Sequence, residues 1–233
     1  MTGNKTFWGG IQSCLPTVLG YIGIGLALGI VGINSNLTLW EIALTSIFIY
    51  AGSAQFIFCG LFLLHAPIPL LVSTIFLVNL RHLLMSMSAS QSFLDGSFRA
   101  NVGIGLLLTD ESFAVLMTEV ARGQKITIRW MNGLNIMAYL TWILATIVGG
   151  LIGRWIPNPY AFGLDYALAA MFAGLFIAQA SLSISAKGKS ILFVLSTVFV
   201  SLYLFMYIVS PEIAILIATL LGCTVGVMIH GHK

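Results

Sequence analysis

Polar side chains interrupt three long apolar runs of the sequence, and they are the residues best suited to chemistry. The interruptions are 50–56 (YAGSAQF), 79–82 (NLRH) and 109–113 (TDESF). Inside lipid each unpaired polar group is costly, so such groups face one another, a cavity or a substrate. Carboxylates, a guanidinium, an imidazole and the backbone of an interrupted helix can together bind a charged small molecule or move protons.

The composition places these groups in a membrane. Of the 233 residues, 59% are hydrophobic and 7% are charged, with a mean hydropathy of +1.03. Soluble domains carry about 25% charged residues. The apolar runs are continuous and do not alternate, which excludes a β-barrel. We therefore predict an all-α polytopic membrane protein with one transporter domain, 1–233. The net charge of +3 gives no indication of nucleic-acid binding.

Eight apolar runs are long enough for membrane-spanning helices, which need about 20 residues each. They fall at 14–33, 41–64, 68–90, 101–121, 128–153, 166–185, 190–209 and 212–230. With a cytoplasmic N-terminus, seven basic residues lie inside, namely Lys5, Arg122, Lys125, Arg129, Lys187, Lys189 and Lys233. Arg99 and Arg154 lie outside, which satisfies the positive-inside rule. We therefore predict that both termini are cytoplasmic.

The polar stretches lie near the centres of three neighbouring runs, so we expect them close to the bilayer midplane. In the run 41–64 the centre is Gly52-Ser53. Glycine–serine pairs kink helices, and Ser53 can cap the half that follows. This predicts a discontinuous helix with exposed N–H groups at midplane depth.

The run 101–121 predicts a second discontinuous helix. Thr109 can cap a half-helix there, with Asp110 and Glu111 in its first turn beside the positive end of the helix dipole. Half-helix N-termini of this kind bind small substrates in many transporters. The two interruptions therefore predict a substrate site.

Two residues of the run 68–90 leave alternatives open. Arg81 can form a buried ion pair with Asp110 or Glu111 that only fixes helix packing, or it can bind substrate. His82 titrates near neutral pH when unperturbed and can carry a proton, but it can equally be an interhelical hydrogen bonder. Helical spacing places a polar stripe on one face of this run, formed by Asn79, His82, Ser86 and Ser90.

The order and spacing of these motifs resemble the AzlC family of branched-chain amino-acid exporters. The segment YAGSAQFIFCGLFLLHAPIPLLVSTIFLVNLRHLLMSMS, followed by LLTDESFAV, carries the resemblance, which covers most of the chain. It implies an exporter of valine, leucine, isoleucine and perhaps methionine in the bacterial inner membrane. It also implies a separately encoded small membrane subunit of the AzlD (YgaH) type as partner, and drive by the proton gradient.

Physical reasoning and the resemblance together give a set of candidate residues. The expected substrate-binding residues are Tyr50, Gly52, Ser53, Gln55, Phe56, Asn79, Arg81, Asp110, Glu111 and Phe113, and the expected proton-coupling residues are His82, Asp110 and Glu111. The substrate carboxylate suits the N–H groups at Gly52-Ser53, or Arg81, and its ammonium suits Asp110 or Glu111. No enzyme activity, metal or cofactor is expected.

Two other functions fit parts of the pattern. An intramembrane serine protease could use Ser53 as nucleophile and His82 as base, but Ala-Gln follows the serine and the carboxylates would have no role. A channel or scaffold subunit is the other alternative. A channel would show a continuous polar stripe through several spans, whereas the polarity here is concentrated at one depth.

Overall fold

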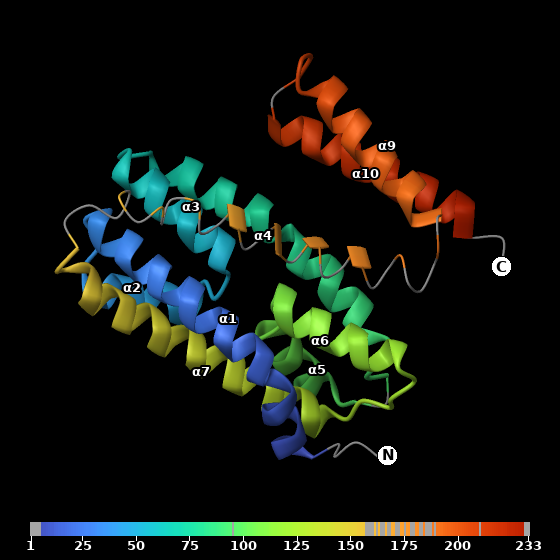
Figure 1. Ribbon diagram of the computed structural model, residues 1–233, viewed down its shortest axis with the longest axis horizontal. Coiled ribbons are helices and arrows are strands. Elements are labelled where there is room, and N and C mark those ends of the chain that lie inside the picture. Colours follow the sequence, from blue (N-terminus) through green and yellow to red (C-terminus); the bar gives the residue numbers. More distant parts are fainter. Residues whose placement is uncertain are drawn as a thin grey trace. The chain divides into compact units, whose positions relative to one another are not determined.

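The computed structural model describes residues 6–94, 96–156, separate positions between 161 and 188, 190–209 and 211–230. Within these residues the elements are helices and no strand occurs (Figure 1), which confirms the predicted all-α class. The chain divides into two compact units, Met1–Leu175 and Phe176–Lys233. The assignment of 1–233 to a single transporter domain stays a prediction.

Glycines let the two long helices α1 (Phe7–Asn34) and α7 (Ile128–Gly153) pack backbone to backbone. The backbone of Phe7 lies against Gly133, and the backbone of Ile30 lies against Gly153. The contacts advance together along both helices, so α1 and α7 run parallel, side by side (Figure 1). Small residues at such contacts are typical of packed membrane helices.

The run 41–64 is broken, as predicted. It forms α2 (Leu39–Phe48) and α3 (Gly52–Leu63). Between them Tyr50 has a φ of 38°, in the left-handed region that non-glycine residues rarely adopt. This turn reverses the chain, which a helical connection could not do.

Contacts with α7 show that α2 and α3 form a hairpin. Ser46 of α2 bonds Thr146, and the ring of Tyr50 packs edge-on against Tyr139, which lies nearer the start of α7. Gln55 of α3 then returns to Ser46, at 3.0 Å. We call α2–α3 the first hairpin; it enters from the end of the unit where α7 finishes and returns to that end.

The run 101–121 is broken in the same way. It forms α5 (Phe98–Leu106) and α6 (Asp110–Ala121), and Thr109 caps α6 as predicted, in a capping box with Ser112. The long helix α4 (Ile68–Ser90) precedes them. Gly105 of α5 faces Ser86 of α4, so α5 runs back along α4 toward the middle of the unit.

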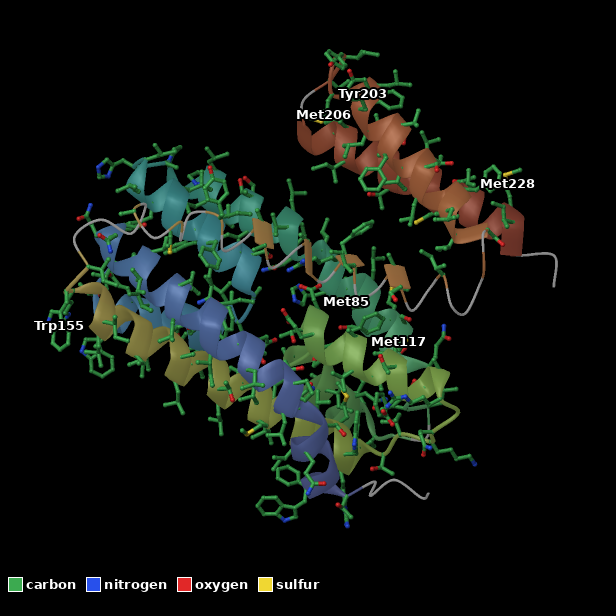
Figure 2. All side chains as sticks on the ribbon, in the orientation of Figure 1. Met85, Met117, Trp155, Tyr203, Met206 and Met228 are labelled. Atoms are coloured by element: carbon green, nitrogen blue, oxygen red, sulfur yellow. The ribbon has the colours of Figure 1, made fainter. Side chains whose placement is uncertain are left out.

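Chain length requires α6 to return to the end where α7 begins. If α6 continued to the far end, residues 122–127 would have to cover the length of α7, about 39 Å for its 26 residues. Extended chain covers at most about 25 Å there. Figure 2 shows Met117 of α6 and Trp155, just beyond α7, at opposite ends of the first unit. We call α5–α6 the second hairpin.

The first unit therefore combines crossing helices with hairpins. Among the described residues, three helices are long and apolar enough to cross a membrane, and they are α1, α4 and α7. The runs 41–64 and 101–121 each turn back on themselves, so they were wrongly predicted to be spans. The count of eight spans is not confirmed.

The two hairpins belong to an inverted repeat. Helices α2, α3 and α4 begin at residues 39, 52 and 68, while α5, α6 and α7 begin at residues 98, 110 and 128. The offsets of 59, 58 and 60 residues are nearly constant. Because α4 ends near the start of α7, where Gly96 faces Ile128, the second set runs opposite to the first. Inverted repeats of this kind are common in transporters.

The hairpin topology also regroups the charges. The end of the unit where α7 begins, which we call the basic end, carries the exposed residues Arg99, Arg122, Lys125 and Arg129. Arg154 lies at the opposite end. The prediction that Arg99 shares a side with Arg154 is therefore wrong, because α5 begins at the same end as α7.

This topology predicts that Arg99 and Arg154 face opposite sides of the membrane. We expect a membrane-impermeant thiol reagent, added to intact cells, to label Arg154→Cys and to leave Arg99→Cys unlabelled, in a variant without the three native cysteines. Arg122→Cys is the matched control and should behave like Arg99→Cys. Labelling of both Arg99→Cys and Arg154→Cys would contradict the second hairpin.

The second unit contains an antiparallel pair, α9 (Ser190–Phe205) and α10 (Pro211–His230). An added Cβ at Gly222 would meet Val198, and one at Gly226 would meet Val194. The contact moves backward along α9 as it moves forward along α10, so the helices are antiparallel. The proposed site lies wholly in the first unit.

Candidate functional site

The tips of the two hairpins meet at one small cavity. Its lining residues come from α1, both tips, α4 and α7, and they are Tyr21, Tyr50, Ala51, Gly52, His82, Thr109, Asp110, Glu111 and Trp142. The cavity volume is about 10 Å³, which is room for one water at most. Five of the predicted site residues are thus brought together around a closed centre.

The N-terminus of α3 faces this cavity without a cap. Ala51 occupies the N-cap position and makes no side-chain hydrogen bond to the helix. The expectation that Ser53 caps α3 is wrong, because Ser53 is already inside the first turn. Uncapped N–H groups and the positive end of the helix dipole suit a negatively charged group.

Arg81 joins the two hairpins. Its Nη2 donates to Ser53 Oγ at 2.6 Å and lies 2.8 Å from Asp110 Oδ2. The side chains of Arg81 and Asp110 are 27% and 12% exposed, so water screens this ion pair only weakly. One guanidinium nitrogen of α4 therefore ties both tips together.

Glu111 stands beside this ion pair with a different partner. Tyr21 of α1 donates to Glu111 Oε2 at 2.8 Å, and its hydroxyl also lies 2.7 Å from Thr109 Oγ1. No arginine or lysine forms a salt bridge with Glu111 among the described residues. The position suits a cation supplied by a ligand.

Repeat-related positions contribute different chemistry to the same cavity. His82 of α4 and Trp142 of α7, which are 60 residues apart, both line it. At the tips, Gly52 begins α3 where Asp110 begins α6. The symmetric fold therefore carries an electrostatically asymmetric site: one tip offers N–H groups and the other offers carboxylates.

Gln55 lies beside the cavity without lining it. Its Nε2 donates to Ser46 Oγ at 3.0 Å, and its Oε1 accepts from Trp142 Nε1 at 2.8 Å. The side chain is 1% exposed. Protein groups therefore use its hydrogen-bonding capacity, and the first hairpin is fastened to α7.

Three further predicted residues lie away from the cavity lining. Phe56 and Phe113 pack into the hydrophobic core. The buried Oδ1 of Asn79 has no hydrogen-bond partner among the described residues. Their substrate-binding roles stay predictions.

Glu111 and Tyr21 also border a wider, apolar groove of about 730 Å³ between α1 and α6. Leu19, Ile24 and Val115 are among the aliphatic side chains along it. A carboxylate at the edge of an aliphatic groove fits a molecule with a cationic head and an apolar tail.

Sequence reasoning did not identify Tyr21 and Trp142 as site residues. Both are amphipathic aromatic residues within apolar runs, and such residues are common in membrane helices. The available signal was that the Tyr21 hydroxyl and the Trp142 indole N–H lie far from the ends of their helices. A metal site, in contrast, has no support in the described part of the chain, where no group of three or more metal-binding side chains forms.

Known proteins share this region of the chain. A family model described as AzlC protein matches residues 16–156, from within α1 to just beyond α7. The chain is 25% identical over 177 residues to the inner membrane protein YgaZ of Escherichia coli, covering 75% of this chain and 72% of the relative.

Two other relatives show similar coverage. The branched-chain amino acid transport protein AzlC of Bacillus subtilis is 27% identical over 185 residues, with 77% of this chain and 71% of the relative covered. An uncharacterized membrane protein of Helicobacter pylori is 24% identical over 202 residues, with 85% and 86% covered. No solved structure matches the chain.

Proposed function

Because the chain belongs to the AzlC family and has a membrane transport role, we propose that it exports branched-chain amino acids. The proposed substrates are valine, leucine and isoleucine, with methionine as a further candidate. The chain acts as a secondary carrier, not as an enzyme. The name of the Bacillus relative supports the substrate class, since it is a branched-chain amino acid transport protein.

The observation that carries this proposal is the pairing of opposite electrostatic groups at one cavity. The uncapped N-terminus of α3 lies opposite the acidic N-terminus of α6. An amino acid is a zwitterion, with a carboxylate and an ammonium close together. The two hairpin tips offer complementary partners at matching proximity.

Each end of the substrate is assigned to one tip. The carboxylate binds the N–H groups at Gly52 and, through exchange of its present partners, Arg81. The ammonium binds Glu111 and Asp110. The aliphatic side chain extends along the groove beside Tyr21, which is lined mainly by apolar residues.

Coupling, partner and orientation are further parts of the proposal. Protons are carried by His82, Asp110 or Glu111, all of which line the cavity. A small AzlD-type membrane subunit completes the exporter. The basic end faces the cytoplasm, in agreement with the positive-inside rule, and both termini are cytoplasmic.

The alternative functions have less support. Ser53 Oγ accepts from Arg81, whose permanent charge rules it out as a base, and no hydrogen bond joins Ser53 to His82 in the described structure. A scaffold subunit would not need opposed ionic groups around a cavity. A channel would need a continuous polar route, whereas the polar groups here line one cavity of about 10 Å³.

The direct test measures valine release from cells that lack their own exporters and are loaded with a valine-containing dipeptide. We expect release when this chain is produced together with its small partner, and faster exchange of labelled valine in vesicles that contain unlabelled valine, which is counterflow. Lysine release is the control and should stay at background. No release of any branched-chain amino acid or methionine, with the protein verified in the membrane, would contradict the substrate assignment.

A further inference from the structure

The cavity is too small for any amino acid, so the described arrangement is a closed one. Its volume of about 10 Å³ accommodates no more than a water. Beside the cavity one atom joins the two hairpin tips, because Arg81 Nη2 contacts Ser53 of the first hairpin and Asp110 of the second. The two tips can separate to make room for a substrate only if at least one of these contacts is exchanged.

The first hairpin is fastened by uncharged hydrogen bonds to α7. Ser46 bonds Thr146 at 2.8 Å, and Gln55 accepts from Trp142 at 2.8 Å. The carbonyl of Ile47 accepts from Tyr139. A zwitterion offers these neutral groups nothing better than they already have, so they hold in the presence of substrate.

Near its tip the second hairpin is held by two charged contacts and by the neutral hydrogen bond between Tyr21 and Thr109. Asp110 pairs with Arg81, and Glu111 accepts from Tyr21. Among the described residues, the neutral side-chain bond from α7 to the second hairpin is that of Asn135 to the carbonyl of Ile104, at 3.2 Å. An ammonium and a carboxylate can replace the charged contacts at Asp110 and Arg81.

We propose that the Arg81–Asp110 ion pair is a substrate-opened latch and that the second hairpin is the gate to the basic end. The substrate carboxylate takes the place of Asp110 on Arg81, and the substrate ammonium takes the place of Arg81 on Asp110. The second hairpin then moves while the first stays on α7. This proposal depends on the proposed function in one respect only, which is the identity of the molecule that opens the latch.

This exchange explains why the second hairpin stays in the closed arrangement when no substrate is bound. Breaking a shielded ion pair without replacement takes an oppositely charged partner away from both Arg81 and Asp110, which is strongly unfavourable. A zwitterion supplies both replacement charges at once, so it stabilises the open state relative to the closed one. A molecule with only one of the two charges replaces only one half of the ion pair.

Three glycines provide labelling positions for a direct measurement. Gly23 of α1, Gly60 of α3 and Gly103 of α5 are exposed, and a Cβ added at each meets no atom within 4 Å. The fold can therefore accept spin labels on cysteines there, and because Gly23 also lines the apolar groove, the labelled variants are first checked for valine export. The distance between labels at positions 23 and 103 follows the second hairpin relative to α1. The distance between labels at positions 23 and 60 follows the first hairpin relative to α1.

Electron–electron distance measurements on the full chain, free of native cysteines and reconstituted in lipid, test the latch. We expect Arg81→Gln to add a second, longer population to the 23–103 distribution and to leave 23–60 unchanged. Asp110→Asn should have the same effect and guards against misfolding of the Arg81 variant. Glu119→Gln is the matched control, because it removes the exposed Glu119–Arg122 ion pair of the same hairpin and should change neither distribution.

Substrate addition separates the latch from the proposed function. In the protein that keeps Arg81 and Asp110, valine should shift the 23–103 distance distribution. Isobutylamine and isobutyrate, which carry one charge each, should not shift it. A 23–103 distribution that is the same in wild type, Arg81→Gln and Asp110→Asn overturns the latch. A shift in both variants with no response to valine supports the latch and overturns valine as substrate. A change in the 23–60 distance distribution contradicts the claim that the first hairpin stays fixed on α7.

Discussion

Replacing Gly29 with alanine is expected to separate α1 from α7 and to lower the melting temperature of the protein. A Cβ at this position would meet the carbonyl oxygen of Thr146 and would lie 2.7 Å from the carbonyl carbon of Gly149. Both are backbone atoms of α7, so no rotamer change can relieve the contact. Overpacking of this kind costs about 1–3 kcal/mol, and helix separation would also disturb the cavity lined by Tyr21 and Trp142.

The same helix provides the control. An added Cβ at Gly20 meets no atom within 4 Å. Alanine stabilises a helix interior by about 0.5–1 kcal/mol relative to glycine, so Gly20→Ala should melt at or above the wild-type temperature. Thermal unfolding of the purified proteins in one detergent checks both. Equal melting of Gly29→Ala and wild type would refute the close parallel packing of α1 and α7.

The breaks in the helices could be predicted from sequence, but the reversal of the chain could not. Gly52 and the cap residue Thr109 are local signals, and both mark real helix starts. A hairpin buried among other helices, however, is as apolar as a lipid-facing rod of equal length. The direction after the break depends on tertiary contacts such as Gln55 with Ser46, which are distant from any local pattern.

Charge counting could not resolve this ambiguity either. Moving Arg99 to the basic end changes the side of a single residue and leaves the positive-inside rule satisfied. The inverted repeat was equally hidden, because Gly-Ser at one tip faces Asp-Glu at the other. Only the spacing of the helix starts is preserved, and spacing becomes readable once the helix bounds are known.

The candidate site shows the same division. Depth in the membrane predicted correctly that Gly52, Arg81 and Asp110 come together. Depth alone cannot tell whether a polar side chain meets a substrate or another part of the protein. Gln55 belongs to the second kind, whereas we propose that Glu111 binds a cation of the substrate.

Replacing Glu111 with glutamine is expected to reduce valine export by a factor of about 30 or more. The variant keeps an oxygen that can accept from Tyr21, which bonds Glu111 at 2.8 Å, so the fold should be retained. It loses the negative charge that we assign to the substrate ammonium. Removing one partner of a shielded, hydrogen-bonded charge pair costs about 2–5 kcal/mol, and each 1.4 kcal/mol is about tenfold in affinity.

Two matched variants show whether the loss of export comes from the charge of Glu111. Tyr21→Phe removes the hydroxyl that donates to Glu111 and leaves the carboxylate in place. A hydrogen bond to a charged group contributes about 1.5–3 kcal/mol, so this variant should reduce export less than Glu111→Gln. Glu119→Gln carries the same chemical change at the exposed end of α6, where Glu119 pairs with Arg122, and should export normally. Initial rates of valine release at equal protein levels give the comparison. Full activity of both Glu111→Gln and Asp110→Asn would remove the ammonium site from the second hairpin, and the zwitterion would then need its cationic partner elsewhere along the cavity.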